Sequence, residues 1–522
     1  MGSSRWKNRR VARQALGPII LIVAMVSQVA AAASPNFIIM IGDDVAWNDH
    51  GSYGHPHIQT PHTDQLAREG MRFDAAFLSI SSCSPSRCSI MTGRYPHSTG
   101  AGELHQPLPA SQVMFPGLLK KRGYYTAAAG KWHLGNTAKA AFDRIEGGRP
   151  SGCERWVTVL KERPRDKPFF LWLAASDAHR DYQAGAIPQP HKNKDVIVPP
   201  YLPDVPDTRK DLALYYDEVS RLDSYVGKVM AELRKQGVDK NTFVLYMSDN
   251  GRPFPRCKTT IYDSGVKTPF IVRWPARVKA GSINANLVSS VDIASTIMEL
   301  AGDKKSTTFQ GRSFVPTLDD ATQKVRDHVF SEHNWHDYSA HERSARDTRY
   351  LYIRNSYPQF PGTPPADAVR SLTYRAMLKM NPAGTLNADQ QGCFIKPRPP
   401  EELYDTQADP HCLENIVASS SHQAILKRLQ GELDQWVKRT GDVVADEIRP
   451  DGFHRQTGAR LKKIGAVLPA IPPVARRIPP AGIKLDQAQR SALSRQLKAL
   501  QRQLADFQEV HGSGGSGAWS AD

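Results

Sequence analysis

The sequence has no RNA- or DNA-binding motif, and its first 33 positions hold no acidic residue. Its formal net charge of +16 is concentrated at the two ends of the chain. Residues 1–33 carry +5 and residues 449–522 carry +7, which leaves +4 for residues 34–448. A mildly basic body is ordinary surface charge, and it suits an anionic substrate without requiring one. We therefore expect no nucleic-acid partner.

An apolar run long enough to span a membrane is also lacking at the N-terminus, where Ile19 to Val26 is only a short stretch. A basic segment precedes this stretch, and Ala31 to Ala33 supply the small residues of a cleavage site. These features predict a secretory signal peptide over residues 1–33, with an uncleaved anchor as the alternative. No cysteine follows the cleavage region, so a lipoprotein anchor is not expected. The mature protein should begin near Ser34 and be periplasmic or secreted, meeting the membrane only during export.

Polar side chains follow two of the buried strands that the sequence predicts. Residues 36–41 and 242–247 are short apolar runs, as expected of central strands buried on both faces. The side chains that follow them are Asp43, Asp44, Asp249 and Asn250. Open α/β sheets bind ligands at the carboxyl ends of such strands, and adjacent carboxylates repel each other unless they share a cation. The pattern favours an oxygen-liganded metal over a solvated turn.

The stretch from residue 83 to residue 93, C-S-P-S-R-C-S-I-M-T-G, combines a cysteine, a proline and an arginine at close spacing. Pro85 suits the first turn of a helix but not its interior, so the stretch predicts a loop that enters a helix. Cys83 would lie at the helix N-terminus, where free N–H groups and the dipole favour an anion. Arg87 could bind an oxyanion with its planar guanidinium. The alternative is a surface loop with a buried cysteine.

Several motifs in order along the chain together resemble those of the type I sulfatases. They are C-S-P-S-R with S-I-M-T-G-R at 83–94, G-K-W-H-L-G at 130–135, S-D-N-G at 248–251 and E-L-Y-D at 402–405. The similarity runs from about Asn36 to about Arg439. It implies an α/β fold of the alkaline-phosphatase-like kind, a sandwich with a large, mostly parallel sheet between helices and a smaller C-terminal α+β subdomain. It also implies a calcium ion, and a formylglycine-generating enzyme that oxidises Cys83 to Cα-formylglycine, whose hydrated aldehyde is the nucleophile.

The resemblance also implies roles for the polar residues of these motifs. The expected catalytic residues are Cys83, Arg87, Lys131, His133, His179 and Lys258. The expected metal ligands are Asp43, Asp44, Cys83, Asp249 and Asn250. The three cationic side chains would offset charge that develops on the sulfuryl oxygens. His179 would protonate the leaving oxygen or nitrogen, and His133 would take a proton from the second hydroxyl of the nucleophile. Lys258 competes with Lys267 for the catalytic role, and we favour Lys258.

Local sequence around the site is similar to that of the heparan N-sulfatases, or sulfamidases. The similar stretches are residues 103–106, 177–180 and 251–255, although Ala178 replaces the family's common proline and Lys258 stands where sulfamidases carry arginine. The residues expected to bind substrate are Asp177, Arg180, His105 and His336. The resemblance implies an exo-acting hydrolase of sulfate esters or sulfamates on a sulfated glycan, with N-sulfoglucosamine as the leading candidate.

Two other functions stay open. Phosphodiesterases and phosphonate monoester hydrolases of the same superfamily share the fold and can use the same modified cysteine. Because the loop at Ala178 departs from the family pattern, a catalytically silent sulfated-glycan-binding protein is the third reading. The expected partners are a sulfated carbohydrate and the formylglycine-generating enzyme, and the oligomeric state is open.

The remaining chain supports mainly structural predictions. Strands are expected at 125–129, 168–175, 270–274, 351–354 and 402–404. Helices are expected in the segments 61–80, 114–122, 209–236, 291–301, 422–439 and 485–510. A Pro-rich, extended segment is expected at 465–483.

The expected division of the chain has three parts after the signal peptide. The catalytic domain occupies residues 34–340, a C-terminal subdomain residues 341–448, and a linker with a helical extension of unknown role residues 449–522. Conversion of the first cysteine leaves five, which allow at most two bridges. Cys393 and Cys412 are plausible partners.

Overall fold

The computed structural model of the protein describes residues 1–2, 34–303 and 308–461. Residues 3–33 of the predicted signal peptide, the extended segment at 465–483 and the helix at 485–510 lie outside the described residues, so these stay predictions. The described residues up to Arg460 belong to one compact unit.

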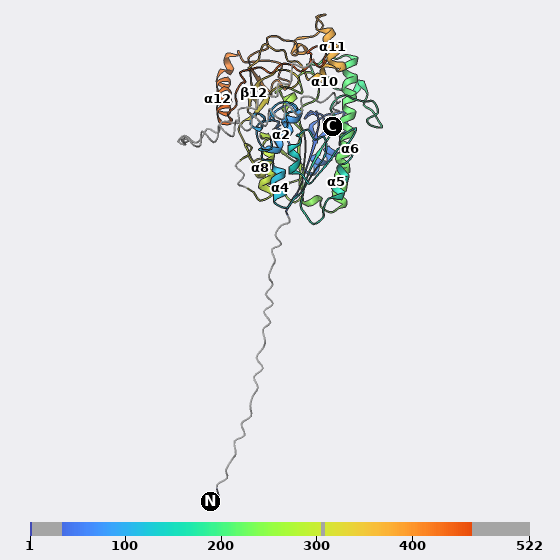
Figure 1. The fold of residues 1–522 in the computed structure, drawn as a ribbon, viewed down its shortest axis with the longest axis vertical. Helices are drawn as coiled ribbons and strands as arrows, with labels where there is room; N and C mark the ends of the chain where they lie inside the picture. The colour runs from blue at the N-terminus through green and yellow to red at the C-terminus, as the bar shows by residue number, and fades with distance from the viewer. Residues whose placement is uncertain (3–33, 304–307, 462–522) are drawn as a thin grey trace, which may run out of the picture. The chain divides into compact units, whose positions relative to one another are not determined.

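An eight-stranded sheet forms the centre of this unit (Figure 1). In sheet order its strands are β5 (Arg144–Glu146), β4 (Tyr125–Gly130), β6 (Phe169–Ala174), β1 (Asn36–Gly42), β7 (Thr242–Ser248), β8 (Phe270–Arg273), β2 (Met71–Phe73) and β9 (Ser282–Asn284). Neighbours pair in parallel except at β8, which is antiparallel to both β7 and β2. The strands predicted from apolar runs are confirmed at β1, β4, β6, β7 and β8.

The side chains of β1 alternate between two apolar cores. Phe37, Ile39 and Ile41 belong to one core, and Ile38 and Met40 to the other. The helices of the first face are α2 (Cys83–Thr92), α4 (Phe115–Lys121) and α8 (Asp292–Leu300), and those of the second are α1 (Pro61–Glu69), α5 (Trp156–Glu162), α6 (Pro206–Lys235) and α11 (Leu372–Met380). Figure 1 shows α4 and α8 on one side of the sheet and α5 and α6 on the other. The expected sandwich is therefore confirmed.

The longest helix, α6, begins slightly earlier than its predicted range because Pro206 suits the first helical turn. Its apolar stripe is buried against the sheet, as the spacing predicts. Asp223 on the same helix accepts hydrogen bonds from the backbone N–H groups of His62 and Thr63 at 3.0 and 2.7 Å. These two donors lie in the first turn of α1, where helical N–H groups lack partners within the helix. One carboxylate thus fastens α1 to α6.

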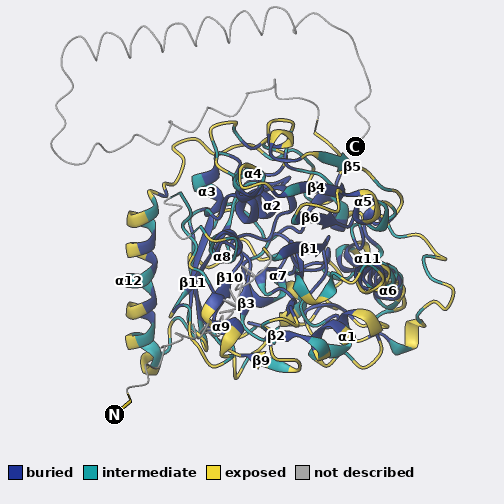
Figure 2. Ribbon diagram, turned by 90° about the horizontal axis from the view of Figure 1, so that it is seen from below, coloured by how far each residue is buried: buried dark blue, intermediate teal, exposed yellow. Residues whose placement is uncertain are grey.

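A smaller antiparallel sheet forms the C-terminal subdomain. Its strands are β11 (Val329–His333), β12 (Glu342–Arg346), β13 (Tyr350–Asn355) and β14 (Glu401–Asp405). Helix α12 (Gln423–Thr440) packs on this sheet, where the ring of Trp436 stacks on Phe330 at 5.2 Å. In Figure 2, α12 has a buried side and an exposed side. The sheet begins before the boundary expected at residue 340, because all of β11 pairs with β12.

Shorter elements connect these layers. They are β3 (Ala76–Phe77) and β10 (Val288–Ser289), which pair with each other, and the helices α3 (Pro96–Thr99), α7 (Asp263–Val266), α9 (Val315–Asp319) and α10 (Ala366–Val369). Helices α10 and α11 lie between β13 and β14 in the sequence. Helix α11 nevertheless packs on α6, where the hydroxyl of Thr373 donates to the carboxylate of Asp211 at 2.7 Å. Among the described residues, no helix combines the length and the apolarity that crossing a membrane requires.

Residues 449–460, expected to open the linker, pack on the body of the protein instead. The indole N–H of Trp335 donates to the carbonyl of Pro450 at 2.9 Å. The backbone N–H of Gly452 donates to the backbone carbonyl of Asp337 at 2.7 Å. Arg455 donates to the carbonyl of Pro361 at 3.1 Å. The linker prediction is wrong for these residues because their backbone and side chains have specific partners on the subdomain.

The predicted disulfide between Cys393 and Cys412 is also wrong. All six cysteines are free and buried. Cys393 belongs to the apolar core that faces α6, whereas Cys412 belongs to the core that faces α2. Each thiol is packed as a small apolar side chain in its own cluster.

Candidate active site

The predicted metal ligands meet at the carboxyl ends of β1 and β7. These strands are direct neighbours, and Gly42 at the end of β1 is in register with Ser248 at the end of β7. The residues that follow each strand therefore lie together, and the backbone N–H of Asp44 donates to Oδ1 of Asp249 at 3.2 Å. The four side chains, all buried, are Asp43, Asp44, Asp249 and Asn250.

Two oxygens in this group make no hydrogen bond with the described residues, although Arg87 lies 3.5 Å from one of them. Oδ1 of Asp43 and Oδ1 of Asn250 are buried and accept no hydrogen bond from any described residue. Carboxylate oxygens of Asp43 and Asp249 and the sulfur of Cys83 all lie within 4.8 Å of one another. Burial raises the pKa of Asp43, but Lys131 and Arg87 outweigh burial and leave that pKa lowered, so the group is a carboxylate. A buried carboxylate oxygen and a buried amide oxygen that accept no hydrogen bond within the described chain fit a hard divalent cation.

Helix α2 presents Cys83 and Arg87 to these carboxylates, as the loop-to-helix pattern predicts. Cys83 is the first residue of the helix and is 2% exposed, with Sγ 3.8 Å from Oδ1 of Asp44. The guanidinium of Arg87 bonds Asp249 at 2.8 Å and lies 3.5 Å from Asp43. Burial raises the pKa of the Cys83 thiol well above its usual value. An unmodified Cys83 is therefore a poor nucleophile at neutral pH, because only the thiolate reacts.

The structure brings Lys258, and not Lys267, to the site. Nζ of Lys258 lies 2.7 Å from Oδ2 of Asp44, and its side chain is 1% exposed. Lys131, directly after β4, pairs with Asp43. Lys267 instead lies over the ring of Trp47, 3.8 Å from its centroid. Lys131 and Lys258 therefore join Arg87 in a cluster of three cations around the carboxylates.

His133 and His105 form a pair at the side of the site, with Nε2 of His133 2.8 Å from Nδ1 of His105. Burial and then Lys131 lower the pKa of both imidazoles, that of His133 most strongly, so both are neutral near pH 7. His105, His133 and Asp44 all have positive φ angles. Such backbone is uncommon for residues other than glycine, and its clustering here is typical of a functional site.

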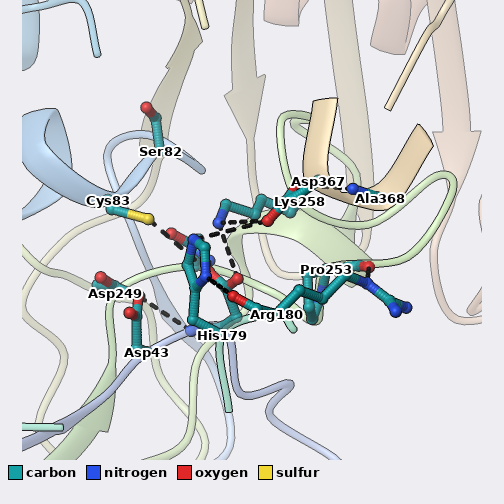
Figure 3. Close-up of polar contacts among 12 residues, drawn as sticks. Asp43, Ser82, Cys83, His179, Arg180, Asp249, Pro253, Lys258, Asp367 and Ala368 are labelled. Atoms are coloured by element: carbon teal, nitrogen blue, oxygen red, sulfur yellow. Dashed lines mark hydrogen bonds and ion pairs between the residues drawn. The ribbon is translucent and has the colours of Figure 1, made fainter. Parts of the chain in front are cut away.

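His179 follows β6 and directs one ring nitrogen toward the centre of the site (Figure 3). Its Nδ1 lies 2.6 Å from the carbonyl of Arg180, which can only accept, so Nδ1 carries a proton. Its Nε2 lies 3.5 Å from Oδ2 of Asp367. His336 is almost fully buried, and its Nδ1 lies 2.7 Å from the hydroxyl of Ser82, the residue before α2.

The predicted sugar-binding roles of Asp177 and Arg180 do not fit the structure. Asp177 is 1% exposed and accepts two hydrogen bonds from Arg221, at 2.7 and 2.8 Å. Arg180 donates twice to Asp211, at 2.7 and 2.9 Å, and lies over the ring of Phe254. Both side chains are occupied by internal ion pairs. They fix the loop that carries His179 and leave no free group for a sugar.

Sequence reasoning missed several residues of the site. Asp367 belongs to α10, in a stretch with no motif and more than a hundred residues beyond Lys258, so only the fold could place it there. Arg221 lies on the polar side of α6, where a charged side chain normally indicates only solvent exposure. Asp211 lies at the start of the same helix and is 2% exposed, and the sequence does not show which cation it meets. Ser82 precedes the cysteine motif, and its hydroxyl bonds His336.

Comparison with known proteins identifies the family. The model of the sulfatase family matches residues 35–150 and 153–303. A second model, described as the C-terminal part of N-sulphoglucosamine sulphohydrolase, matches residues 256–357. An ulvan-active sulfatase of Formosa agariphila is 30% identical over 465 residues, which cover 78% of this chain and 75% of the relative. Human N-sulphoglucosamine sulphohydrolase is 30% identical over 477 residues, which cover 81% of this chain and 94% of the relative.

Solved structures agree on the fold. One, determined in complex with its substrate D-glucosamine-2-N,6-O-disulfate, has a TM-score of 0.61 at 21% identity and covers 79% of this chain and 99% of its own. A second, a 2-O GAG sulfatase, has a TM-score of 0.59 at 20% identity and covers 82% and 98%. The family match covers more than half of the chain and includes the strand ends that carry the carboxylates and the helix that carries Cys83. The chain therefore belongs to the sulfatase family and is a hydrolase of sulfate esters or sulfamates.

Proposed function

We propose that this protein is an exported sulfatase that removes sulfate from a glycan, with N-sulfoglucosamine at a non-reducing end as the leading substrate. The match of residues 256–357 to the C-terminal model of N-sulphoglucosamine sulphohydrolase carries this proposal. The 30% identity to the human enzyme of that name, over 94% of its length, supports it. The fold relative bound to D-glucosamine-2-N,6-O-disulfate points to the same class of sugar. Export to the periplasm or the medium is proposed from the basic and apolar N-terminal sequence.

We further propose that a formylglycine-generating enzyme converts Cys83 to Cα-formylglycine and that calcium completes the site. The raised pKa of the Cys83 thiol supports the first point, because the unmodified side chain is inert. The buried oxygens of Asp43 and Asn250 that accept no hydrogen bond from the part of the chain that the structure describes support the proposed calcium ion, since calcium takes six to eight oxygen ligands. Asp44 and Asp249 would complete the protein's share of these ligands. Together the two groups would supply an oxygen nucleophile and a positive charge beside the sulfate.

The side chains around this centre have the charges that sulfuryl transfer needs. Arg87, Lys131 and Lys258 are held in place by ion pairs with carboxylates, so they can stabilise negative charge on sulfate without rearranging. His179 would donate a proton from Nε2 to the leaving atom, because its Nδ1 is committed to a carbonyl. His133 is neutral and can accept a proton from the nucleophile in the second half of the reaction.

Two histidines stay candidates for substrate binding. His105 is exposed beside His133, so its free edge can meet a sugar hydroxyl. His336 lines a small cavity with Thr259 and Arg398, but only a few per cent of its surface is open. We propose that His105 contacts the substrate directly and that His336 contributes to the wall of the site.

The proposal is tested first by the mass of the peptide that contains Cys83, from protein purified from its native host. The aldehyde is expected; a thiol alone in active enzyme would contradict the proposed nucleophile. Sulfate release is then measured side by side from N-sulfated glucosamine, 6-O-sulfated glucosamine and an aryl sulfate. A higher kcat/KM for the aryl compound than for both sugars would exclude a glycan substrate.

Phosphate and phosphonate esters, tested in the same assay, address the phosphoryl-transfer alternative. Preference for either ester over every sulfated compound would contradict the proposed substrate class. A modified Cys83 with no turnover, combined with binding of a sulfated glycan, would favour a silent binding protein. The aldehyde and the assay thus separate the three functions.

A further inference from the structure

Asp367 directs one carboxylate oxygen toward His179 and Lys258 in the active site (Figure 3). Its Oδ2 is buried and accepts no hydrogen bond from any described residue, although the side chain as a whole is 14% exposed. The same oxygen lies 3.5 Å from Nε2 of His179 and 3.8 Å from Nζ of Lys258. Its other oxygen accepts the backbone N–H of Ala368 at 2.7 Å.

The backbone on both sides of Asp367 is fixed, so this oxygen cannot easily turn away. The N–H of Ala366 donates to Oδ2 of Asp337 at 2.9 Å. Downstream, Thr373 donates from its hydroxyl and its N–H to Asp211 at 2.7 and 3.3 Å. Asp211 also holds Arg180, the residue next to His179. The segment that carries Asp367 and the loop that carries His179 are therefore both held by Asp211.

Oδ2 of Asp367 accepts no hydrogen bond among the described residues, and its two cationic neighbours lie only at 3.5 and 3.8 Å, so this buried oxygen is incompletely paired. Native structures rarely keep such a group without a purpose. Burial raises the pKa of Asp367, but Lys258 and then His179 outweigh it, so the group is ionised. A second metal ion is a poor occupant, although Asp44, His179 and Asp367 have donor atoms within 4.8 Å of one another. The ammonium of Lys258 already lies 2.7 Å from Asp44 and would repel it. A hydrogen-bond donor of the substrate is the better fit.

We propose that Asp367 is a substrate-binding residue that accepts a hydrogen bond from the leaving nitrogen of a sulfamate and pairs with the ammonium of the amine product. This inference rests on the proposed action on N-sulfated sugars. As the S–N bond breaks, the sulfuryl group passes to the oxygen nucleophile at position 83, and the nitrogen keeps the bonding electron pair. The nitrogen retains its own hydrogen and takes one proton from Nε2 of His179. The resulting amine takes a further proton from water and becomes an ammonium ion beside the carboxylate.

The test uses sugars that differ only at carbon 2. Binding of glucosamine, glucose and N-acetylglucosamine is measured by calorimetry at pH 7 on full-length Cys83→Ala protein, which needs no maturation and turns nothing over. We expect glucosamine to bind at least tenfold more tightly than the other two sugars. Asp367→Asn, nearly identical in shape, should weaken glucosamine binding at least tenfold and change glucose binding less than twofold. Asp367→Glu, which keeps the charge, should retain part of the preference for glucosamine.

Asp337→Asn is the matched control, because Asp337 holds the same backbone segment without facing His179. It should lower the melting temperature and leave the ratio of glucosamine to glucose affinity unchanged. Equal affinity of the parent protein for the three sugars would overturn the inference, and so would unchanged glucosamine binding in Asp367→Asn. A loss of bound metal in Asp367→Asn, measured by elemental analysis, without loss of amine preference, would show a metal-binding role instead. If Asp367→Asn does not fold, an unchanged preference in Asp367→Ala or a complete loss in Asp367→Glu would equally overturn it.

These outcomes are separate from the test of the proposed function. Release of sulfate from 6-O-sulfated but not N-sulfated glucosamine would contradict the N-sulfated substrate, whatever the binding data show. Conversely, cleavage of N-sulfoglucosamine at an unchanged rate and KM by Asp367→Asn would leave the proposed function intact and remove the role of Asp367.

Discussion

Replacement of Lys258 gives the sharpest test of the site, because a second lysine nine residues later provides a control. Lys258 is buried, and its ammonium bonds Asp44 at 2.7 Å. Lys258→Ala removes a cation that we propose faces the sulfate, and loss of such a preorganised group lowers kcat by roughly a hundredfold or more. A hundredfold corresponds to about 2.7 kcal/mol of transition-state stabilisation. We therefore expect kcat/KM for sulfate release to fall by at least that factor.

The same substitution should also reduce stability. Removal of one partner of a buried ion pair leaves the other charge uncompensated, at a cost of about 3–5 kcal/mol in the free energy of unfolding. Lys258→Arg keeps the charge, so it should fold normally and retain more activity than Lys258→Ala. Denaturant unfolding, followed by fluorescence, separates the stability effect from the kinetic one.

Lys267→Ala is the control. Lys267 is half-buried, and its ammonium lies over the ring of Trp47. Loss of a cation–π contact should cost about 0.5–2 kcal/mol of stability and leave kcat/KM within a fewfold of the parent. If Lys267→Ala lost more activity than Lys258→Ala, the assignment of the catalytic lysine would be refuted.

Three further predictions concern chemistry, metal and pH. Cys83→Ala should abolish sulfate release, and measurable turnover would contradict the role of Cys83 as nucleophile. The same substitution should shift the melting temperature by only a few degrees, because the polar contact of Sγ with Asp44 is weak, at 3.8 Å. Chelation with EDTA should abolish activity but leave the circular dichroism spectrum of the folded protein unchanged, because Lys131 and Lys258 pair with Asp43 and Asp44 without an ion. Full activity after verified metal removal would exclude a catalytic role for the metal. Burial lowers the pKa of His341 in the folded protein to about 3, whereas a histidine in the unfolded chain has a pKa of about 6.5. Between these two pH values the unfolded chain binds more protons than the folded protein, so the free energy of unfolding falls as the pH falls. At pH 5 the loss is about 2 kcal/mol relative to neutral pH. His341→Gln should flatten this part of the stability curve, and an unchanged slope would contradict the argument.

The sequence predicted the parts of the site that depend on local patterns. The buried strands ending in Asp43 and Asp249 are short apolar runs, and adjacent parallel strands necessarily bring their ends together. The start of α2 at Cys83 followed from the tolerance of helix first turns for proline. In each of these cases, the physical cause lies within a few residues of the effect.

The errors involve contacts between distant segments. Asp177 and Arg180 looked like free polar groups, but Arg221 and Asp211 on α6 neutralise them. No local pattern indicates which acid an arginine will meet after folding. Cys393 and Cys412 are close in sequence, yet their thiols are free and pack in different apolar clusters. Asp367 was missed for the same reason, because only its contacts with His179 and Lys258 in the folded protein place it in the site.

The burial of α2 would determine when the proposed modification of Cys83 can take place. Every residue from Cys83 to Thr92 is buried in the folded protein, so another enzyme cannot enclose this stretch in its own active site. In the maturation that we propose, oxidation of the thiol would therefore precede the docking of α2 against α4 and α8, and it would compete in time with folding. A chain that folds first retains the thiol until it unfolds again. Under this proposal, the fraction of active molecules would depend on the rates of oxidation and of folding, and slower folding of this one segment would raise the yield of active enzyme.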